Sequence, residues 1–308
     1  MIRSRRTLMT LAVALAASVA GVGFVAAQAD PAHGGAPASV KVMEWNACGN
    51  NSACKYYEDP DGLVATMRWH MLNHGRAADA AIFEETCGSF AKKLEHDLES
   101  HTGKGWDVRF APIKLKRTSD PSTSPAKKCV RDRGQYGTMI ALPDENTWWD
   151  TKYLPSPDGK EWRVAMCATV PSWNVKLCNA HFTSPGEDPD GKFRPQQVKA
   201  YQDFVAPSRF QVLFGGDLNL ASPVESGNAS GGVNPLYDSF VECAQKDASA
   251  PRSGPGTYYQ TNPHDNAHTS KIDYLFTDRG VTHGCGTPGG TVESSDHRPI
   301  WMTADLKG

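Results

Sequence analysis

The sequence has little excess charge of either sign. Its 32 lysine and arginine residues stand against 34 aspartate and glutamate residues, which gives a formal net charge of −2 at pH 7. Proteins that hold polyanions by bulk charge carry a large positive excess. This balance excludes binding of that kind, so any contact with phosphate groups must depend on local positive groups or on a metal ion.

Long apolar runs are also scarce. The one such run covers residues 8–25, follows the basic residues Arg3, Arg5 and Arg6, and precedes the small-residue sequence Ala27-Gln28-Ala29. This order is typical of a secretory signal peptide over residues 1–29, with a retained membrane anchor as the alternative. Ser4-Arg5-Arg6 also resembles a twin-arginine signal, which leaves the export route open.

We therefore expect a secreted, extracellular protein without stable membrane insertion. Removal of residues 1–29 leaves 279 residues and, because three arginines are lost, a formal net charge of 29 − 34 = −5. Residues 30–39 are rich in proline, glycine and alanine and are expected to form a flexible tail. Residues 40–308 show no fixed-period repeat and no break in composition, so we expect one catalytic domain.

The sequence has no C-x-x-C pair, although it contains eight cysteines. An even number of cysteines in an exported chain favours disulfide bonds over zinc thiolates. Eight cysteines allow 105 pairings. Closeness in sequence suggests the pairs Cys48–Cys54, Cys87–Cys129, Cys167–Cys178 and Cys243–Cys285.

Hydrophobic patterns predict more strands than helices. Strands are expected at residues 40–45, 78–83, 106–112, 136–142, 162–170, 175–180, 211–214, 257–259, 271–276 and 300–304. Helices are expected at residues 63–72, around 90–98 and at 194–204, with loops at 118–128 and 221–234 and a short amphipathic segment at 236–243. Many strands are neighbours in sequence, which indicates an α/β sandwich of mixed, mainly antiparallel sheets with flanking helices.

Polar side chains follow several of these strands. After the apolar residues 211–214, two glycines are expected to break the strand before Asp217, and Asn219 should point to the same side as Asp217. A carboxylate can accept a proton or bind a hard cation, and an amide can donate to an oxyanion. An ordinary turn is the alternative for this motif alone. Asn46, Glu85, His181 and His297 also follow expected strands, so we expect all of these groups to converge at one edge of the sandwich.

Six segments in this order resemble the endonuclease/exonuclease/phosphatase superfamily, also called deoxyribonuclease-I-like. They are Glu44-Trp45-Asn46, Ile82-Phe83-Glu84-Glu85, Asn179-Ala180-His181-Phe182, Gly216-Asp217-Leu218-Asn219, Lys271-Ile272-Asp273-Tyr274 and Ser295-Asp296-His297. Each segment is short, but together they span nearly the whole predicted domain. The resemblance implies a four-layer α/β sandwich and divalent-metal-dependent cleavage of phosphoester bonds.

The resemblance also implies roles for single residues. Glu85, Asp296 and Asn46 would hold or place the metal, expected to be Mg²⁺ with Mn²⁺ or Ca²⁺ possible. Glu84 stands where the family usually has glutamine. The catalytic residues that the resemblance implies are His181, Asp217, Asn219, Asp273 and His297.

Within this set, Asp273 would pair with His297, Asp217 would orient or deprotonate water, and Asn219 would bind a non-bridging phosphate oxygen. His181 would assist the leaving group, although the sequence leaves open which group is the acid and which the base. Tyr136 and Arg163 are candidates for substrate phosphate contacts or for structural roles. His264 and His268 could line the rim of the substrate site.

The leading hypothesis is a secreted, metal-dependent phosphodiesterase, most plausibly a monomeric endonuclease acting on DNA. A sphingomyelinase-type phospholipid phosphodiesterase and a phosphomonoesterase are alternatives within the same chemistry. Trp148, Trp149 and Trp173 are the only candidates for membrane docking. A non-catalytic binding protein is a further alternative, but it would gain nothing from this combination of carboxylates and histidines.

Overall fold

The computed structural model describes residues 36–73, 77–227, 232–245, 251–259, 269–278, 282–288 and 292–306. The predicted signal peptide, most of the predicted tail, His264 and His268 lie outside these residues. Ser39, expected in the tail, is the first residue of a strand. Among the described helices, none combines the length and the apolar character needed to cross a membrane.

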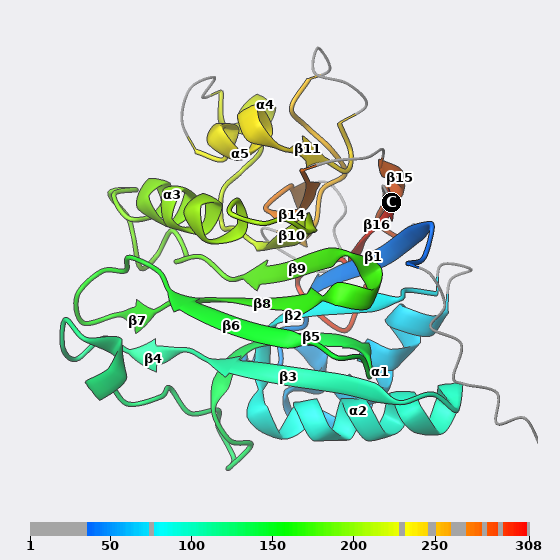
Figure 1. Cartoon of the computed structure of the whole chain (residues 1–308). Coiled ribbons are helices and arrows are strands. Elements are labelled where there is room, and N and C mark those ends of the chain that lie inside the picture. Colours follow the sequence, from blue (N-terminus) through cyan, green and yellow to red (C-terminus); the bar gives the residue numbers. More distant parts are fainter. Residues whose placement is uncertain are drawn as a thin grey trace, which may run out of the picture. The chain divides into compact units, whose positions relative to one another are not determined.

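The first large sheet contains the amino-terminal strands and the carboxyl-terminal strand (Figure 1). Its order is β15 (Thr282–Gly286), β16 (Ile300–Asp305), β1 (Ser39–Asn46), β2 (Ala80–Cys87), β5 (Tyr136–Pro143) and β3 (Trp106–Pro112). Two helices lie along this sheet: α1 (Pro60–Leu72) and α2 (Gly88–Thr102). Asp59 caps α1 by accepting a hydrogen bond from the Gly62 amide at 2.9 Å, as expected for an acid before a Pro-initiated helix.

The second large sheet is built from the middle of the chain. Its order is β11 (Val241–Glu242), β14 (Asp273–Thr277), β10 (Gln211–Asp217), β9 (Val175–Ala180), β8 (Val164–Val170) and β6 (Trp148–Tyr153). Three helices lie beside it: α3 (Arg194–Val205), α4 (Pro223–Ser226) and α5 (Asn234–Ser239) (Figure 1). Short elements complete the described fold: β4 (Lys114–Leu115), β7 (Glu161–Trp162), β12 (Tyr258–Tyr259), β13 (Thr269–Ser270) and the 3-10 turns η1 (Lys55–Tyr57), η2 (Pro121–Thr123) and η3 (Pro171–Trp173).

The alternation of side chains along β8 shows how the layers pack. Val164, Met166 and Ala168 join a core shared with the first sheet and with α1 and α2. Ala165 and Cys167 point the other way, into a core formed with α3 and α5. Because successive residues of a strand face opposite sides, one strand serves both cores. The resulting order of helices, sheet, sheet and helices confirms the predicted four-layer α/β sandwich.

Four disulfide bonds join all eight cysteines, in the pairs that closeness in sequence suggests: Cys48–Cys54, Cys87–Cys129, Cys167–Cys178 and Cys243–Cys285. Cys167 and Cys178 are also directly opposed in the β8–β9 ladder. Two of the pairs are local, with sequence separations of 6 and 11, and the other two each span 42 residues.

Some expectations about secondary structure are wrong. The strand β6 was not expected, because Trp148–Tyr153 is a half-exposed edge strand with no continuous apolar run. The expected loop at residues 221–234 contains α4, which begins at a Ser222 cap and Pro223. Lys271 and Ile272 precede β14 and do not belong to it. In each case the element depends on packing against distant parts of the chain rather than on a local hydrophobic period.

Candidate functional site

Glu85 reaches the site through an irregularity in β2. The sequence suggested that β2 ends at Glu84 and Glu85, but the strand continues to Cys87. The β2–β5 register shifts between Phe83 and Thr86, and Glu85 has a φ of +53°. Such bulges redirect a side chain and are common beside functional sites. The bulge therefore turns Glu85 out of the sheet toward the end of the sandwich.

The glycines before Asp217 have a different role from the one expected. Gly215 and Gly216 do not break the strand, because β10 runs through both to Asp217. A Cβ atom on Gly215 would lie 1.9 Å from the Tyr274 carbonyl oxygen, and one on Gly216 would lie 2.0 Å from the Ala180 carbonyl oxygen. Gly216 also has a φ of +127°. Glycine is needed here so that β10 can approach both neighbouring strands closely.

The predicted site residues meet at one end of the sandwich. A cavity of about 720 Å³ lies there, and its lining includes Glu85, Tyr136, Arg163, His181, Asp217, Asn219, Asp296 and His297. Asn46 and Asp273 are buried beside it, and both bond to residues of its wall. All ten candidate residues are therefore brought together.

His297 forms a buried pair with Asp273. The ring Nδ1 of His297 lies 2.9 Å and 3.0 Å from the two carboxylate oxygens of Asp273. Burial by itself lowers the pKa of His297, but the charge and hydrogen bonds of Asp273 outweigh it and raise the pKa well above its usual value. The pair thus favours an imidazolium whose Nε2 hydrogen faces the cavity.

His181 is held in the opposite state. The guanidinium of Arg163 lies 3.2 Å from His181 Nδ1, and since arginine can only donate, this nitrogen must accept. Burial, followed by the positive charge of Arg163, lowers the pKa of His181 well below its usual value. The neutral ring therefore carries its hydrogen on Nε2, which lies 3.4 Å from Asp217 Oδ2.

Asp217 lies between these two histidines. Burial raises its pKa to about 7, and the negative charge of Asp273 adds to the rise, while His297 acts to lower it. Its Oδ2 accepts a hydrogen bond from Asn46 Nδ2 at 3.0 Å, and its Oδ1 accepts from the Asn219 amide at 2.9 Å. A carboxyl group with a pKa near neutrality can take up and release a proton at physiological pH.

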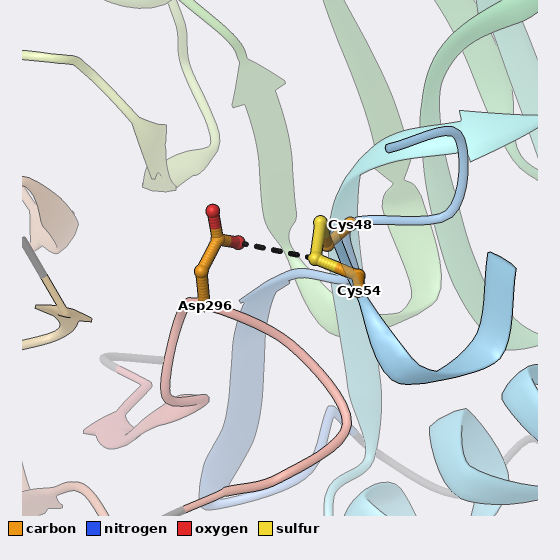
Figure 2. Close-up of side chains that lie close together, drawn as sticks. All are labelled: Cys48, Cys54 and Asp296. Carbon is orange, nitrogen blue, oxygen red and sulfur yellow. Dashed lines mark hydrogen bonds between the residues drawn. A yellow bond between two sulfur atoms is a disulfide. The ribbon is translucent and has the colours of Figure 1, made fainter. Parts of the chain in front are cut away.

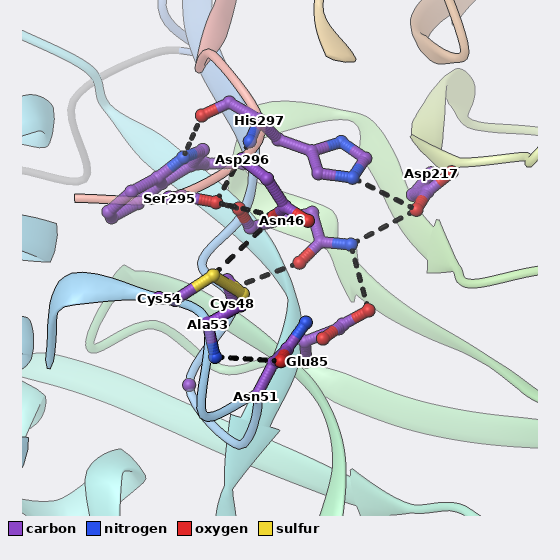
Figure 3. The surroundings of a disulfide bond; sticks show 12 residues. Asn46, Cys48, Asn51, Ala53, Cys54, Glu85, Asp217, Ser295, Asp296 and His297 are labelled. Atoms are coloured by element: carbon purple, nitrogen blue, oxygen red, sulfur yellow. Dashed lines mark hydrogen bonds and ion pairs between the residues drawn. A yellow bond between two sulfur atoms is a disulfide. The ribbon is translucent and has the colours of Figure 1, made fainter. Parts of the chain in front are cut away.

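Glu85 and Asp296 offer carboxylate oxygens for a hard cation, and Asn46 lies beside them. Asn46 Nδ2 lies 3.4 Å from Glu85 Oε1 (Figure 3). Removal from solvent, followed by the negative charge of Asp296, raises the pKa of Glu85. Two carboxylates that repel each other supply the oxygen atoms that Mg²⁺ prefers, whereas Asn46 presents its Nδ2, because its Oδ1 accepts from the Cys48 amide. The residues present therefore fit a divalent cation held by Glu85 and Asp296.

Asn219 and Tyr136 occupy the rim with constrained side chains. Asn219 has a φ of +50°, and its Nδ2 donates to the Phe182 carbonyl at 3.1 Å, so one of its two amide hydrogens is already used. Burial, followed by the charge of Glu85, raises the pKa of the Tyr136 hydroxyl well above its usual value. Tyr136 therefore stays protonated and can act as a donor.

Several residues of the cavity wall were not anticipated from the sequence. Lys127 lies 4.3 Å from the centre of the Tyr136 ring and forms an ion pair with Glu161. Arg163 also pairs with Glu187 at 2.7 Å. Tyr258 lies beside His297, with ring centres 4.8 Å apart. No sequence signal marks Lys127 or Tyr258.

The sequence and the fold match known proteins. The sequence profile of the Endonuclease/Exonuclease/phosphatase family matches residues 43–297, so the chain belongs to this family. Members of the family hydrolyse phosphoester bonds and generally use divalent metal ions. No curated protein sequence matches this chain.

Solved structures share the fold at low sequence identity. An endonuclease/exonuclease/phosphatase from Beutenbergia cavernae has a TM-score of 0.59 at 18% identity, covering 88% of this chain and 72% of its own. D. rerio TDP2, solved in complex with single strand DNA product, has a TM-score of 0.58 at 14% identity, with 87% and 99% covered. The human Nocturnin catalytic domain with bound sulfate anion has a TM-score of 0.57 at 14% identity, with 87% and 94% covered. These likenesses concern the fold.

Proposed function

We propose that this protein is an exported, Mg²⁺-dependent phosphodiesterase and that it acts as an endonuclease on DNA. The observation that carries the proposal is the placement of Asp217 between a neutral His181 and a charged His297, beside the oxygen-rich group of Glu85 and Asp296. A binding protein has no use for two histidines held in opposite protonation states. Phosphodiester hydrolysis needs one proton acceptor and at least one donor.

The protonation states support specific roles. Asp217 accepts the proton of the attacking water, because its pKa lies near 7. His297, charged through Asp273, can release a proton to an oxygen of the phosphate group, and neutral His181 donates a hydrogen bond from Nε2 on the leaving-group side while keeping its hydrogen. A cation bound by Glu85 and Asp296 would neutralise charge on the phosphate.

Other features of the cavity favour a nucleic-acid strand. Lys127 and Arg163 lie on one wall, where Glu161 and Glu187 pair with them, and the half-buried Tyr258 offers a ring on which a base could stack. D. rerio TDP2, which shares the fold, was solved with a single strand DNA product.

The exposed Trp148 gives little support to a lipid substrate. Trp148 pairs with Thr169, which in turn pairs with Lys176 near the start of β9, whereas His181 follows the end of β9. Trp148 and its neighbour Phe210 therefore lie at the far end of the sheet from the site. A membrane-docking residue would be expected beside the cavity.

One experiment separates these substrates. The mature protein is incubated with plasmid DNA, RNA, sphingomyelin or a chromogenic phosphomonoester, with Mg²⁺ or with EDTA. We expect Mg²⁺-dependent cleavage of the plasmid within the strand, loss of cleavage with EDTA, and loss with His297→Ala or Asp217→Ala. His96→Ala, at an exposed position of α2, is the matched control and should cleave like the wild type.

Cleavage of sphingomyelin without DNA would replace the nuclease assignment, and no hydrolysis of any substrate with metal would refute the enzyme assignment. The same preparation tests the remaining expectations. Expression of the full chain should release into the medium a protein that lacks residues 1–29. Size-exclusion chromatography of that product should give the mass of a monomer.

A further inference from the structure

The Cys48–Cys54 disulfide lies directly against the proposed site. Cys48 follows Asn46 by two residues, beyond the end of β1, and Cys54 closes the loop six residues later. The bond lies between this loop and Asp296, which comes from the segment before β16 (Figures 2 and 3). The disulfide thus lies in contact with two parts of the site that are far apart in sequence.

On one side, the loop fixes the orientation of the Asn46 side chain. The Cys48 backbone amide donates to Asn46 Oδ1 at 3.1 Å. With its oxygen engaged, Asn46 turns Nδ2 toward Asp217 and Glu85. Cys48 makes this contact from a left-handed conformation with φ of +52°, which a residue other than glycine holds only under outside restraint. Closure of the loop through Cys54 supplies such a restraint.

On the other side, the disulfide packs against Asp296. Cys54 Sγ lies 3.8 Å from Asp296 Oδ1. A sulfur in a disulfide carries no hydrogen, so this is a packing contact that limits where the carboxylate can turn. Ser295 reinforces the arrangement, because its hydroxyl donates to the Asn46 carbonyl at 2.8 Å and its oxygen accepts from the His297 amide at 3.0 Å.

We propose that the Cys48–Cys54 bond is a positioning element for cation binding: it restrains Asp296 directly, and it restrains Glu85 through the Asn46 amide that donates to it. The proposal rests on the metal-dependent function proposed above. Without the bond, the Asn46 amide can rotate away from Asp217, and the Asp296 carboxylate loses its packing surface. Both changes weaken cation binding and slow hydrolysis, although neither cysteine contacts a substrate.

The test compares two disulfide deletions. Cys48→Ala/Cys54→Ala removes the bond at the site. Cys167→Ala/Cys178→Ala is the matched control, since it removes a buried bond between β8 and β9 that does not line the cavity. The control bond closes the longer segment, 11 residues against 6, so its loss should cost at least as much stability.

Mg²⁺ affinity is measured by calorimetry and hydrolysis by kcat and KM on plasmid DNA. For the site variant we expect Mg²⁺ affinity and kcat each to fall on the order of 10–100-fold, with KM little changed, as for other residues that orient metal ligands. The control should match the wild type in both. The Asn46 side-chain amide resonances should shift in the site variant and stay in place in the control.

A second variant separates the backbone from the sulfur contact. In Cys48→Gly/Cys54→Ala, glycine adopts the left-handed conformation without strain, so this chain should fold even if the alanine pair does not. It still lacks the contact with Asp296 and should show reduced Mg²⁺ affinity.

Wild-type Mg²⁺ affinity in both site variants, or an equal loss in the control, would overturn the positioning role while leaving the enzyme assignment intact. If the wild type binds Mg²⁺ but hydrolyses nothing, the proposed function fails, and the calorimetric comparison still decides the role of the disulfide.

Discussion

Replacing Glu84 by glutamine should reduce the loss of stability that we expect for the wild type as the pH rises from acid to neutral. Glu44 and Glu84 come from adjacent parallel strands and are fully buried. As long as both groups are ionised, none of their four carboxyl oxygens accepts a hydrogen bond from a described residue. Burial raises the pKa of each well above its usual value, and the negative charges of Asp273 and Asp217 raise both further. The pair must therefore retain protons that the unfolded chain releases.

The sign and size of the effect follow from linkage. Above about pH 4.3, the usual pKa of glutamic acid, the unfolded chain loses a proton that the folded protein keeps. The free energy of unfolding then falls with rising pH by about 1.4 kcal/mol per pH unit for each retained proton, until the pH passes the raised pKa. Glutamine removes one such proton, and its amide can donate to Glu44. The slope for Glu84→Gln should therefore be smaller by about 1.4 kcal/mol per pH unit.

Urea unfolding followed by circular dichroism at a series of pH values, with EDTA present and the disulfides intact, measures both slopes. Glu99→Gln, at an exposed position of α2, is the matched control, and its slope should equal that of the wild type. Equal slopes for Glu84→Gln and wild type would show that Glu84 is ionised in the folded protein and would refute the reasoning. Hydrolysis should survive this substitution, because the family usually has glutamine at the position.

Three further predictions concern single residues. Asp273→Asn keeps the shape of the pair but removes the negative charge beside His297. The pKa of His297, followed by NMR, should therefore fall, and kcat should drop on the order of 10²–10⁴-fold. An unchanged kcat would exclude the pair from the chemistry. Arg163→Gln removes the positive charge beside His181, so the His181 pKa should rise in the same NMR experiment, and a constant value would contradict the assigned cause. Gly216→Ala forces a Cβ against the Ala180 carbonyl and should lower the free energy of unfolding by at least about 2 kcal/mol. Gly159→Ala is the control, and it should lower the free energy of unfolding by less, because the space around its Cβ is open.

The sequence predicts the sandwich and its site because both follow from local order. Asn46 and His181 stand at the carboxyl ends of apolar strands and His297 stands before one, and parallel or antiparallel pairing brings these ends together whatever the details of register. The same local information does not predict how the Glu85 side chain is directed or why glycine is needed at position 216. The bulge in β2 depends on its register with β5, and the need for glycine depends on the Ala180 carbonyl across the sheet. No pattern within either strand contains that information.

The two histidines show most clearly where sequence reasoning stops. His181 follows a core strand and His297 precedes one, and the sequence leaves open which group acts as the acid and which as the base. Their protonation states depend on the group that contacts Nδ1 of each ring. For His181 it is the guanidinium of Arg163, which directly precedes β8, and for His297 it is the carboxylate of Asp273, from β14. A cation behind one ring and an anion behind the other place a neutral and a charged histidine beside Asp217, and each ring carries its hydrogen on Nε2. The acid and base roles that the sequence leaves open thus depend on two buried partners, and exchanging the charge of either partner should exchange the preference of its histidine.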